Sequence, residues 1–211
     1  IPWNQIMNIF QKAWVAVVET IGKVHWKPKN LLDETEREIL RQFLAKDYYV
    51  LLSHRKNHLS TYMISFANLF VAGKMSYWSH AFMNLEDTVK DDNDFIFAEA
   101  IGSGVKTSHF DEVADVNGIV LLKPKHLTID KWTAILDTAK ENMGRPYDNL
   151  FDLKNDKELS CVELVRDCLQ ADPDYLTNFA EFERLISKRK NLTPQMYYDC
   201  PDFEVVWERR R

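Results

Sequence analysis

Three short β-rich runs follow one another in the middle of the chain, and they constrain its fold more than any other feature. They are SYWSHAFM at residues 76–83, DFIFAEAI at 94–101 and NGIVLLKP at 117–124. The segments between them carry turn residues and charges, which are typical of exposed connections. Consecutive short strands with such connections favour an antiparallel sheet.

Apolar residues recur at helical spacing on both sides of these runs, so the chain is predicted to be α+β. Its 211 residues suit one domain with a sizeable core, and it contains no internal repeat. Asp33 and Thr128 are predicted to cap two of the helices. The predicted helices cover residues 3–21, 33–46, 59–73, 128–143, a segment that begins at 161, 172–190 and 193–200; a short strand at 48–53 precedes the third, and FEVVW at 203–207 follows the last.

Composition excludes several classes of function. The formal net charge of −5 provides no general attraction to nucleic acid or to anionic lipid. The longest stretch without a charged residue or histidine, 59–73, is too short and too polar to span a bilayer, so no transmembrane segment is expected. Only three cysteines occur and the first residues lack a signal-peptide pattern, which together favour a cytoplasmic location.

Cys161 lies where a helix is predicted to begin. Ser160 and Glu163 form the S-x-x-E pattern of a capping box, which places Cys161 at the first helical position. Unpaired N–H groups and the positive end of the helix dipole favour a thiolate there. The same segment also fits a buried apolar stripe in which Cys161 only fills the core, and taken alone it favours that interpretation.

His80 and Glu99 are both anomalous for their predicted strands. Alternation places His80 on one strand face with Trp78 and Phe82, where a histidine is more often a core residue unless an acid faces it. Glu99 stands between apolar neighbours on the next strand, and burying it without a partner would cost several kcal/mol. Both anomalies are resolved if His80 and Glu99 pair with each other and with Cys161, as base, orienting acid and nucleophile.

The chain resembles the circularly permuted NlpC-type, papain-like cysteine hydrolases of the YiiX kind over roughly residues 46–207. The resemblance rests on seven motifs in the family's order: YYVLLS, SYWSHAFM, FAEAIGSGVKTSHFDEV, IVLLKPKHLT, NMGRPYDNLF, ELSCVELV and TPQMYYDCPDFEVV.

The resemblance implies a permuted papain-like fold, in which a small antiparallel sheet or barrel packs against the cysteine-bearing helix. It makes Cys161 the nucleophile, His80 the general base and Glu99 the orienting acid. Tyr147 matches a tyrosine that lines the site and helps to hold the oxyanion. Phe82 departs from the family pattern after the histidine, and we expect it to reshape a pocket to which Ser160 and Trp78 also contribute.

The predicted function is therefore a cysteine hydrolase or acyltransferase that works through a thioester-type intermediate, in a catalytic domain at 46–211 with an N-terminal helical extension at 1–45. The substrate is expected to be a peptide, a cell-wall peptide or an acyl, lipid-like group. The alternative is a catalytically inert papain-like scaffold that serves as a binding module. His109, His126 and Cys200 do not fall into metal-ligand spacings, and His54 and His58, four residues apart, have no third ligand placed nearby. Neither a metal nor a cofactor is therefore predicted, and the oligomeric state stays open.

Overall fold

The computed structural model describes residues 29–56, 75–85, 95–148, 157–188 and 192–211, together with the single positions 61, 62, 64 and 69. The helices predicted at 3–21 and 59–73 therefore lie outside the described residues, apart from those four positions. Within the part of the chain that is described, no helix is long and apolar enough to cross a membrane.

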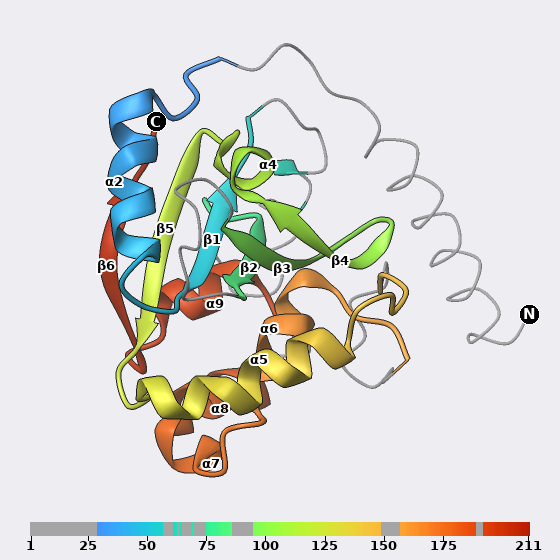
Figure 1. The fold of residues 1–211 in the computed structure, drawn as a ribbon. Helices are drawn as coiled ribbons and strands as arrows, with labels where there is room; N and C mark the ends of the chain where they lie inside the picture. Colours follow the sequence, from blue (N-terminus) through green and yellow to red (C-terminus); the bar gives the residue numbers. More distant parts are fainter. Residues whose placement is uncertain are drawn as a thin grey trace, which may run out of the picture.

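Six strands form one antiparallel sheet with the order β4-β3-β2-β1-β5-β6 (Figure 1). The predicted antiparallel sheet is thus confirmed. The strands are β1 (Val50–His54), β2 (His80–Asn84), β3 (Ile96–Ile101), β4 (Gly104–His109), β5 (Gly118–Pro124) and β6 (Phe203–Arg209).

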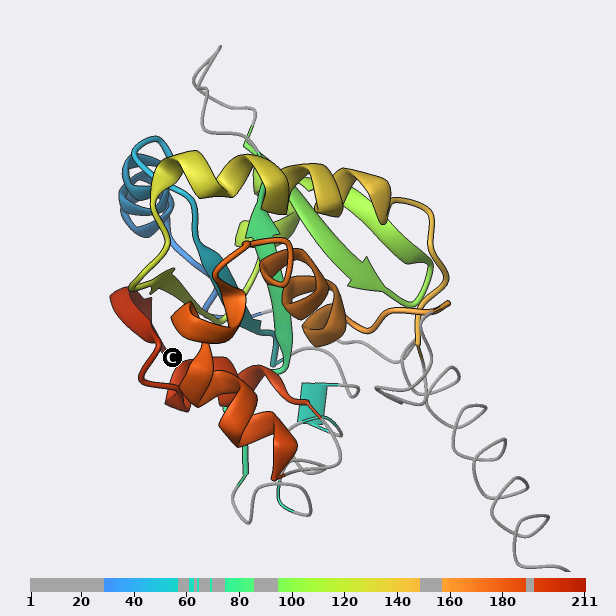
Figure 2. The same cartoon turned by 90° about the horizontal axis from the view of Figure 1, so that it is seen from below.

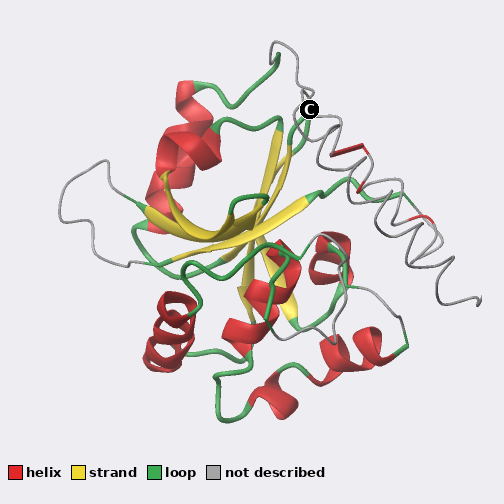
Figure 3. Cartoon of the chain, turned by 90° about the vertical axis from the view of Figure 1, so that its right-hand side faces the viewer, coloured by secondary structure: helices red, strands yellow, loops and turns green. Residues whose placement is uncertain are grey.

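Helices cover both faces of this sheet (Figure 3). Alternation along β1 explains how: Val50 and Leu52 enter one core, whereas Leu51 enters the other. The helices are α2 (Glu34–Leu44), α4 (Phe110–Ala114), the 3₁₀ turn η1 (Ile129–Lys131), α5 (Trp132–Glu141), α6 (Cys161–Leu169), α7 (Tyr175–Asn178), α8 (Ala180–Ser187) and α9 (Pro194–Asp199).

The larger core contains apolar side chains of α5, α6, α8 and α9, packed against one face of the sheet. Helices α5 and α6 lie side by side on that face (Figure 2), and α6 contacts β2 and β3. The smaller core contains apolar side chains of α2 and α4, on the other face. The cysteine-bearing helix is therefore packed directly on the strands that carry His80 and Glu99.

Two helix starts follow the predicted capping chemistry. Asp33 and Glu36 form a complete capping box at α2, and Ser160 and Glu163 form one at α6. At 128–143 the outcome differs, because the Thr128 side chain makes no capping hydrogen bond and a 3₁₀ turn precedes α5.

The exposed connection predicted between the runs at 94–101 and 117–124 is wrong in part. Residues 102 and 103 do form a turn, but β4 and α4 follow directly within the same segment. Gly104 opens β4 with a φ of 106°, a conformation that glycine adopts without steric cost. β2 also begins at His80, four residues later than the run at 76–83 predicts.

Candidate active site

His80 and Glu99 meet across neighbouring strands. His80 is the first residue of β2, and Glu99 stands opposite Phe82 in the β2–β3 register. Because side chains two positions apart on a strand share a face, His80 and Glu99 project to the same side of the sheet. His80 Nε2 lies 2.9 Å from Glu99 Oε2, which leaves ring nitrogen Nδ1 for a second partner.

Cys161 supplies that second partner. It occupies the first position of α6, directly after the N-cap residue Ser160, and is only 2% exposed. Cys161 lies close enough to the ring to raise the pKa of His80. The three residues predicted from the sequence as nucleophile, base and orienting acid are therefore adjacent in the order Cys161, His80, Glu99.

Strand β4 completes the surroundings of Glu99. The Ser108 hydroxyl donates a short hydrogen bond to Glu99 Oε1, and Lys106 Nζ lies 3.6 Å from the same oxygen. Lys106 Nζ also lies 3.0 Å from Glu112 Oε2. Because Lys106 stands opposite Glu99 in the β3–β4 register and Ser108 is two positions further along, both side chains share a face with the carboxylate.

These contacts shift the pKa values of both His80 and Glu99. Burial lowers the pKa of His80, but hydrogen bonds and charges from Cys161 and Glu99 outweigh it and raise the pKa to about 9. Burial raises the pKa of Glu99, but hydrogen bonds from His80 and Ser108, with the charges of His80 and Lys106, lower it to about 2. At neutral pH the site therefore contains an imidazolium between Cys161 and a carboxylate.

Tyr147 also reaches Cys161. Val105 N–H donates to Arg145 O at 2.8 Å, and Leu159 N–H donates to Pro146 O at 3.0 Å, so the segment before Tyr147 is attached both to β4 and to the residues that precede α6. Burial, followed by the charges of Cys161 and nearby acids, raises the pKa of Tyr147 well above its ordinary value. Its hydroxyl is thus a neutral hydrogen-bond donor beside the sulfur.

Three residues expected to contribute to the pocket, Phe82, Trp78 and Ser160, are buried. Phe82 stacks on the His80 ring, with centroids 5.5 Å apart, and belongs to the smaller core. Phe82 therefore supports the imidazole from this side. Trp78 lies in the larger core, where the Arg210 guanidinium and the Tyr198 ring pack against it.

Sequence reasoning missed Ser108 and Lys106, because it predicts a loop for their segment. The signal was present, since Lys106 and Ser108 follow a glycine turn in a segment that also contains strand-favouring Val105 and Thr107.

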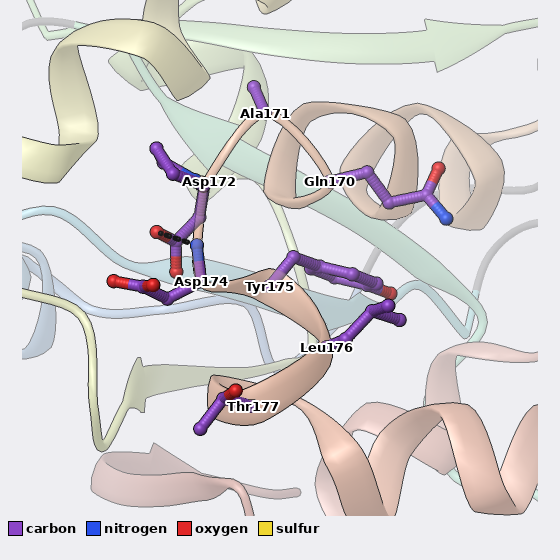
Figure 4. Close-up of a pocket in the computed structure, with 8 residues that line it drawn as sticks. Gln170, Ala171, Asp172, Asp174, Tyr175, Leu176 and Thr177 are labelled. Carbon is purple, nitrogen blue, oxygen red and sulfur yellow. Dashed lines mark hydrogen bonds between the residues drawn. The ribbon is translucent and has the colours of Figure 1, made fainter.

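A surface hollow lies at the opposite end of α6 and contains none of the predicted site residues (Figure 4). It is formed by the single segment 170–177, in which Asp172 accepts a hydrogen bond from the Asp174 N–H. Asp172 and Asp174 are also paired with Lys131. The acidic groups of this hollow are therefore already satisfied by the chain.

Comparison with known proteins shows the family and the fold of this chain. A family model described as permuted papain-like amidase enzyme, YaeF/YiiX, C92 family, matches residues 49–207. The solved structure of metalloprotein yiiX from Escherichia coli O157:H7 is similar, with a TM-score of 0.58 and 19% sequence identity, and the alignment covers 79% of this chain and 99% of that one. At this identity the likeness shows the fold. No curated protein matches the chain significantly.

The solved yiiX structure is described as that of a metalloprotein. Among the residues described here, no three His, Cys, Asp or Glu side chains form a group that could hold one. This part of the chain therefore offers no donor set that fits a metal.

Proposed function

The chain belongs to the permuted papain-like amidase family, and from this premise we propose that it hydrolyses an amide bond of a peptide-type substrate with Cys161, His80 and Glu99 as its catalytic residues. The observation that carries the proposal is the adjacency of a helix-start cysteine, an imidazole and a carboxylate, with 2.9 Å between His80 Nε2 and Glu99 Oε2. Nucleophilic catalysis by cysteine requires this arrangement of thiol, base and orienting group.

In the first half of the reaction, the Cys161 thiolate attacks the carbonyl carbon and forms a carbon–sulfur bond. The charge that develops on the carbonyl oxygen is stabilised by the Cys161 backbone N–H, which has no intrahelical partner at this position, and by the Tyr147 hydroxyl. The carbon–nitrogen bond then breaks as the imidazolium of His80 gives its proton to the leaving amine. The products of this half are an amine and an acyl thioester.

In the second half, His80 acts in the opposite sense. The neutral imidazole removes a proton from water, and the resulting hydroxide oxygen attacks the thioester carbonyl carbon. The carbon–sulfur bond breaks, a carboxylic acid leaves, and the proton remains on His80 beside the restored thiolate. Glu99 stabilises the imidazolium in both halves, and Ser108 and Lys106 keep that carboxylate charged and oriented.

The test is the alkylation of the three cysteines by iodoacetamide at about pH 6 followed by peptide mapping. Cys161, Cys168 and Cys200 are all buried, so exposure alone does not distinguish them. Burial raises the pKa of Cys168 well above its ordinary value and raises that of Cys200 to about 12. Cys161 should therefore react more than about a hundredfold faster than the other two, because only the thiolate is nucleophilic.

His80→Ala is the matched variant in this experiment. It removes the imidazolium but leaves the helix dipole, so the Cys161 rate should fall by about tenfold or more without reaching the rate of Cys168. Equal labelling of all three cysteines, or a Cys161 rate that does not depend on His80, would contradict the proposal and favour an inert scaffold.

A further inference from the structure

The proposed nucleophile and the proposed base both stand at the start of an element. His80 is the first residue of β2; it is paired with Ser53 of β1, whereas the described pairing of β2 with β3 starts only at Phe82. Cys161 is the first residue of α6, where backbone N–H groups lack partners within the helix. The ends of strands and helices open more readily than their centres. The distance between the thiol and the imidazole therefore depends on contacts from outside these two elements.

Helix α9 makes such a contact with the segment that leads into β2. Gln195 of this helix is 8% exposed, and its Oε1 accepts the Tyr77 N–H at 3.3 Å and lies 3.3 Å from Ser76 Oγ. The Gln195 amide group donates in turn to Asp199 Oδ1 at 3.0 Å, which fixes the orientation of the amide. Gln195 thus anchors to α9 the backbone three residues before His80.

The same helix also reaches the first turn of α6. The Tyr197 hydroxyl donates to Val162 O at 2.7 Å, and Val162 directly follows Cys161. Tyr197 is fully buried, and its ring packs against Phe182 and Phe203, with centroid distances of 4.5 and 5.5 Å. These close contacts restrict the position of the hydroxyl. Tyr197 thus anchors to α9 the backbone that follows the proposed nucleophile.

Gln195 and Tyr197 stand two positions apart on α9, and side chains at that spacing point to different sides of a helix. We propose that α9, through Gln195 and Tyr197, holds His80 and Cys161 at the distance that their mutual stabilisation and proton transfer require. Both are positioning residues, because each acts through a backbone segment, and their catalytic purpose rests on the proposed function. A displacement of about 1 Å in such a site can lower a rate by about a hundredfold.

The test is the pH dependence of Cys161 alkylation by iodoacetamide in Tyr197→Phe and in Gln195→Met. Both substitutions nearly keep the size of the side chain and remove its hydrogen bonds. A thiolate that is farther from the imidazolium is stabilised less, so the midpoint, the pH at which the rate is half of its maximum, should rise by about one unit or more. Charged groups of the site such as Glu99 and Lys106 are the same in both variants.

Tyr175→Phe is the matched control. It removes another buried tyrosine hydroxyl of the larger core, one that donates to Glu183 Oε1 at 2.6 Å rather than to the backbone of the cysteine helix. It should lower the free energy of unfolding, measured with urea, about as much as Tyr197→Phe does, because each loses one buried hydrogen bond. The midpoint of Cys161 alkylation should nevertheless stay within about 0.3 units of the wild type.

The same substitutions in a His80→Ala background separate positioning from a general loss of stability. Without the imidazole no pair remains to be held, so Tyr197→Phe and Gln195→Met should then move the midpoint by less than about 0.3 units. An unchanged midpoint in both variants, an equal shift in Tyr175→Phe, or a shift that does not depend on His80 would overturn the inference. Failure of the proposed function has a different signature, namely a midpoint that His80→Ala by itself does not move.

Discussion

At the scale of single residues, the His80–Glu99 pair links the chemistry of the site to the stability of the fold. The pKa of His80 is raised to about 9, so its contribution to stability is complete below its unfolded value of about 6.5 and is lost as the pH rises through 9. The pKa of Glu99 is lowered to about 2, so its contribution is complete above about 4.5 and is lost as the pH falls through 2. The pair therefore stabilises the fold most between about pH 4.5 and pH 6.5.

Replacing Glu99 by Gln tests this link at one residue. The substitution keeps the shape of the side chain but removes the carboxylate, so the pKa of His80 should fall and the variant should lose most of its turnover while it remains folded. A titration of the His80 ring by NMR measures the shift without any knowledge of the substrate. Glu112→Gln is the control, because Glu112 contacts Lys106 rather than the ring; an equal shift in both variants would contradict the assignment.

At the scale of elements, the β3–β4 hairpin determines where the Tyr147 segment lies. Gly144 N–H donates to Val105 O at 2.9 Å and Val105 N–H donates to Arg145 O at 2.8 Å, which fastens residues 144 and 145 to the outer edge of β4. A Cβ atom at Gly104 would lie 2.6 Å from Arg145 O. The glycine is therefore required both by its φ of 106° and by this close approach of the backbone.

Gly104→Ala should accordingly lower the free energy of unfolding by roughly 1–3 kcal/mol and also lower the alkylation rate of Cys161, because the displaced segment carries Tyr147. Gly102→Ala provides a matched control in the same hairpin. No atom lies within 4 Å of a Cβ at Gly102 and its φ is not positive, so its effect should stay within about 0.5 kcal/mol. Urea denaturation measures both variants, and equal destabilisation would contradict this account of the hairpin.

At the scale of the whole molecule, Arg209 ties the first described segment to the last strand. Its side chain is 6% exposed and donates to Glu36 Oε1 at 3.0 Å and to Leu31 O at 3.0 Å, with a further short bond to Asn117 O. The C-terminal end of β6 accordingly lies beside α2 (Figure 1). Residues 34–44 thus pack on the sheet. That residues 1–45 form one N-terminal helical extension stays a prediction.

Arg209→Met should lower the free energy of unfolding by about 3 kcal/mol, because it leaves the buried Asn117 carbonyl and the part-buried Leu31 carbonyl without this donor and removes one of the two arginines that pair with Glu36. Arg211→Met is the comparison. Arg211 pairs with Asp33 and Glu36 at a partly exposed site, where an ion pair contributes less than about 1 kcal/mol. Comparable losses in the two variants, measured by chemical denaturation, would show that Arg209 does not hold the segment.

Much of this protein was determined by patterns within short stretches of sequence. The capping boxes at Asp33 and Ser160 need only residues three positions apart, and the strand alternation that sets His80 and Glu99 apart from their neighbours has a period of two. Such patterns indicate the local conformation of a segment and which of its side chains share a face. They were sufficient for the antiparallel sheet and for the start of the cysteine helix. The three residues proposed as catalytic required these patterns to be combined with one another and with the family resemblance.

Only the tertiary structure decided which distant segments face one another. It placed β4 beside β3 and so brought Ser108 and Lys106 to Glu99, and it buried Trp78 beneath Arg210. The alternation within a strand does not depend on which strand pairs with it. Likewise, the sequence does not reveal whether a carboxyl group will be solvated by water or buried beside another side chain. These contacts depend on the packing of the entire core, because close-packed side chains have to satisfy burial and hydrogen bonding together.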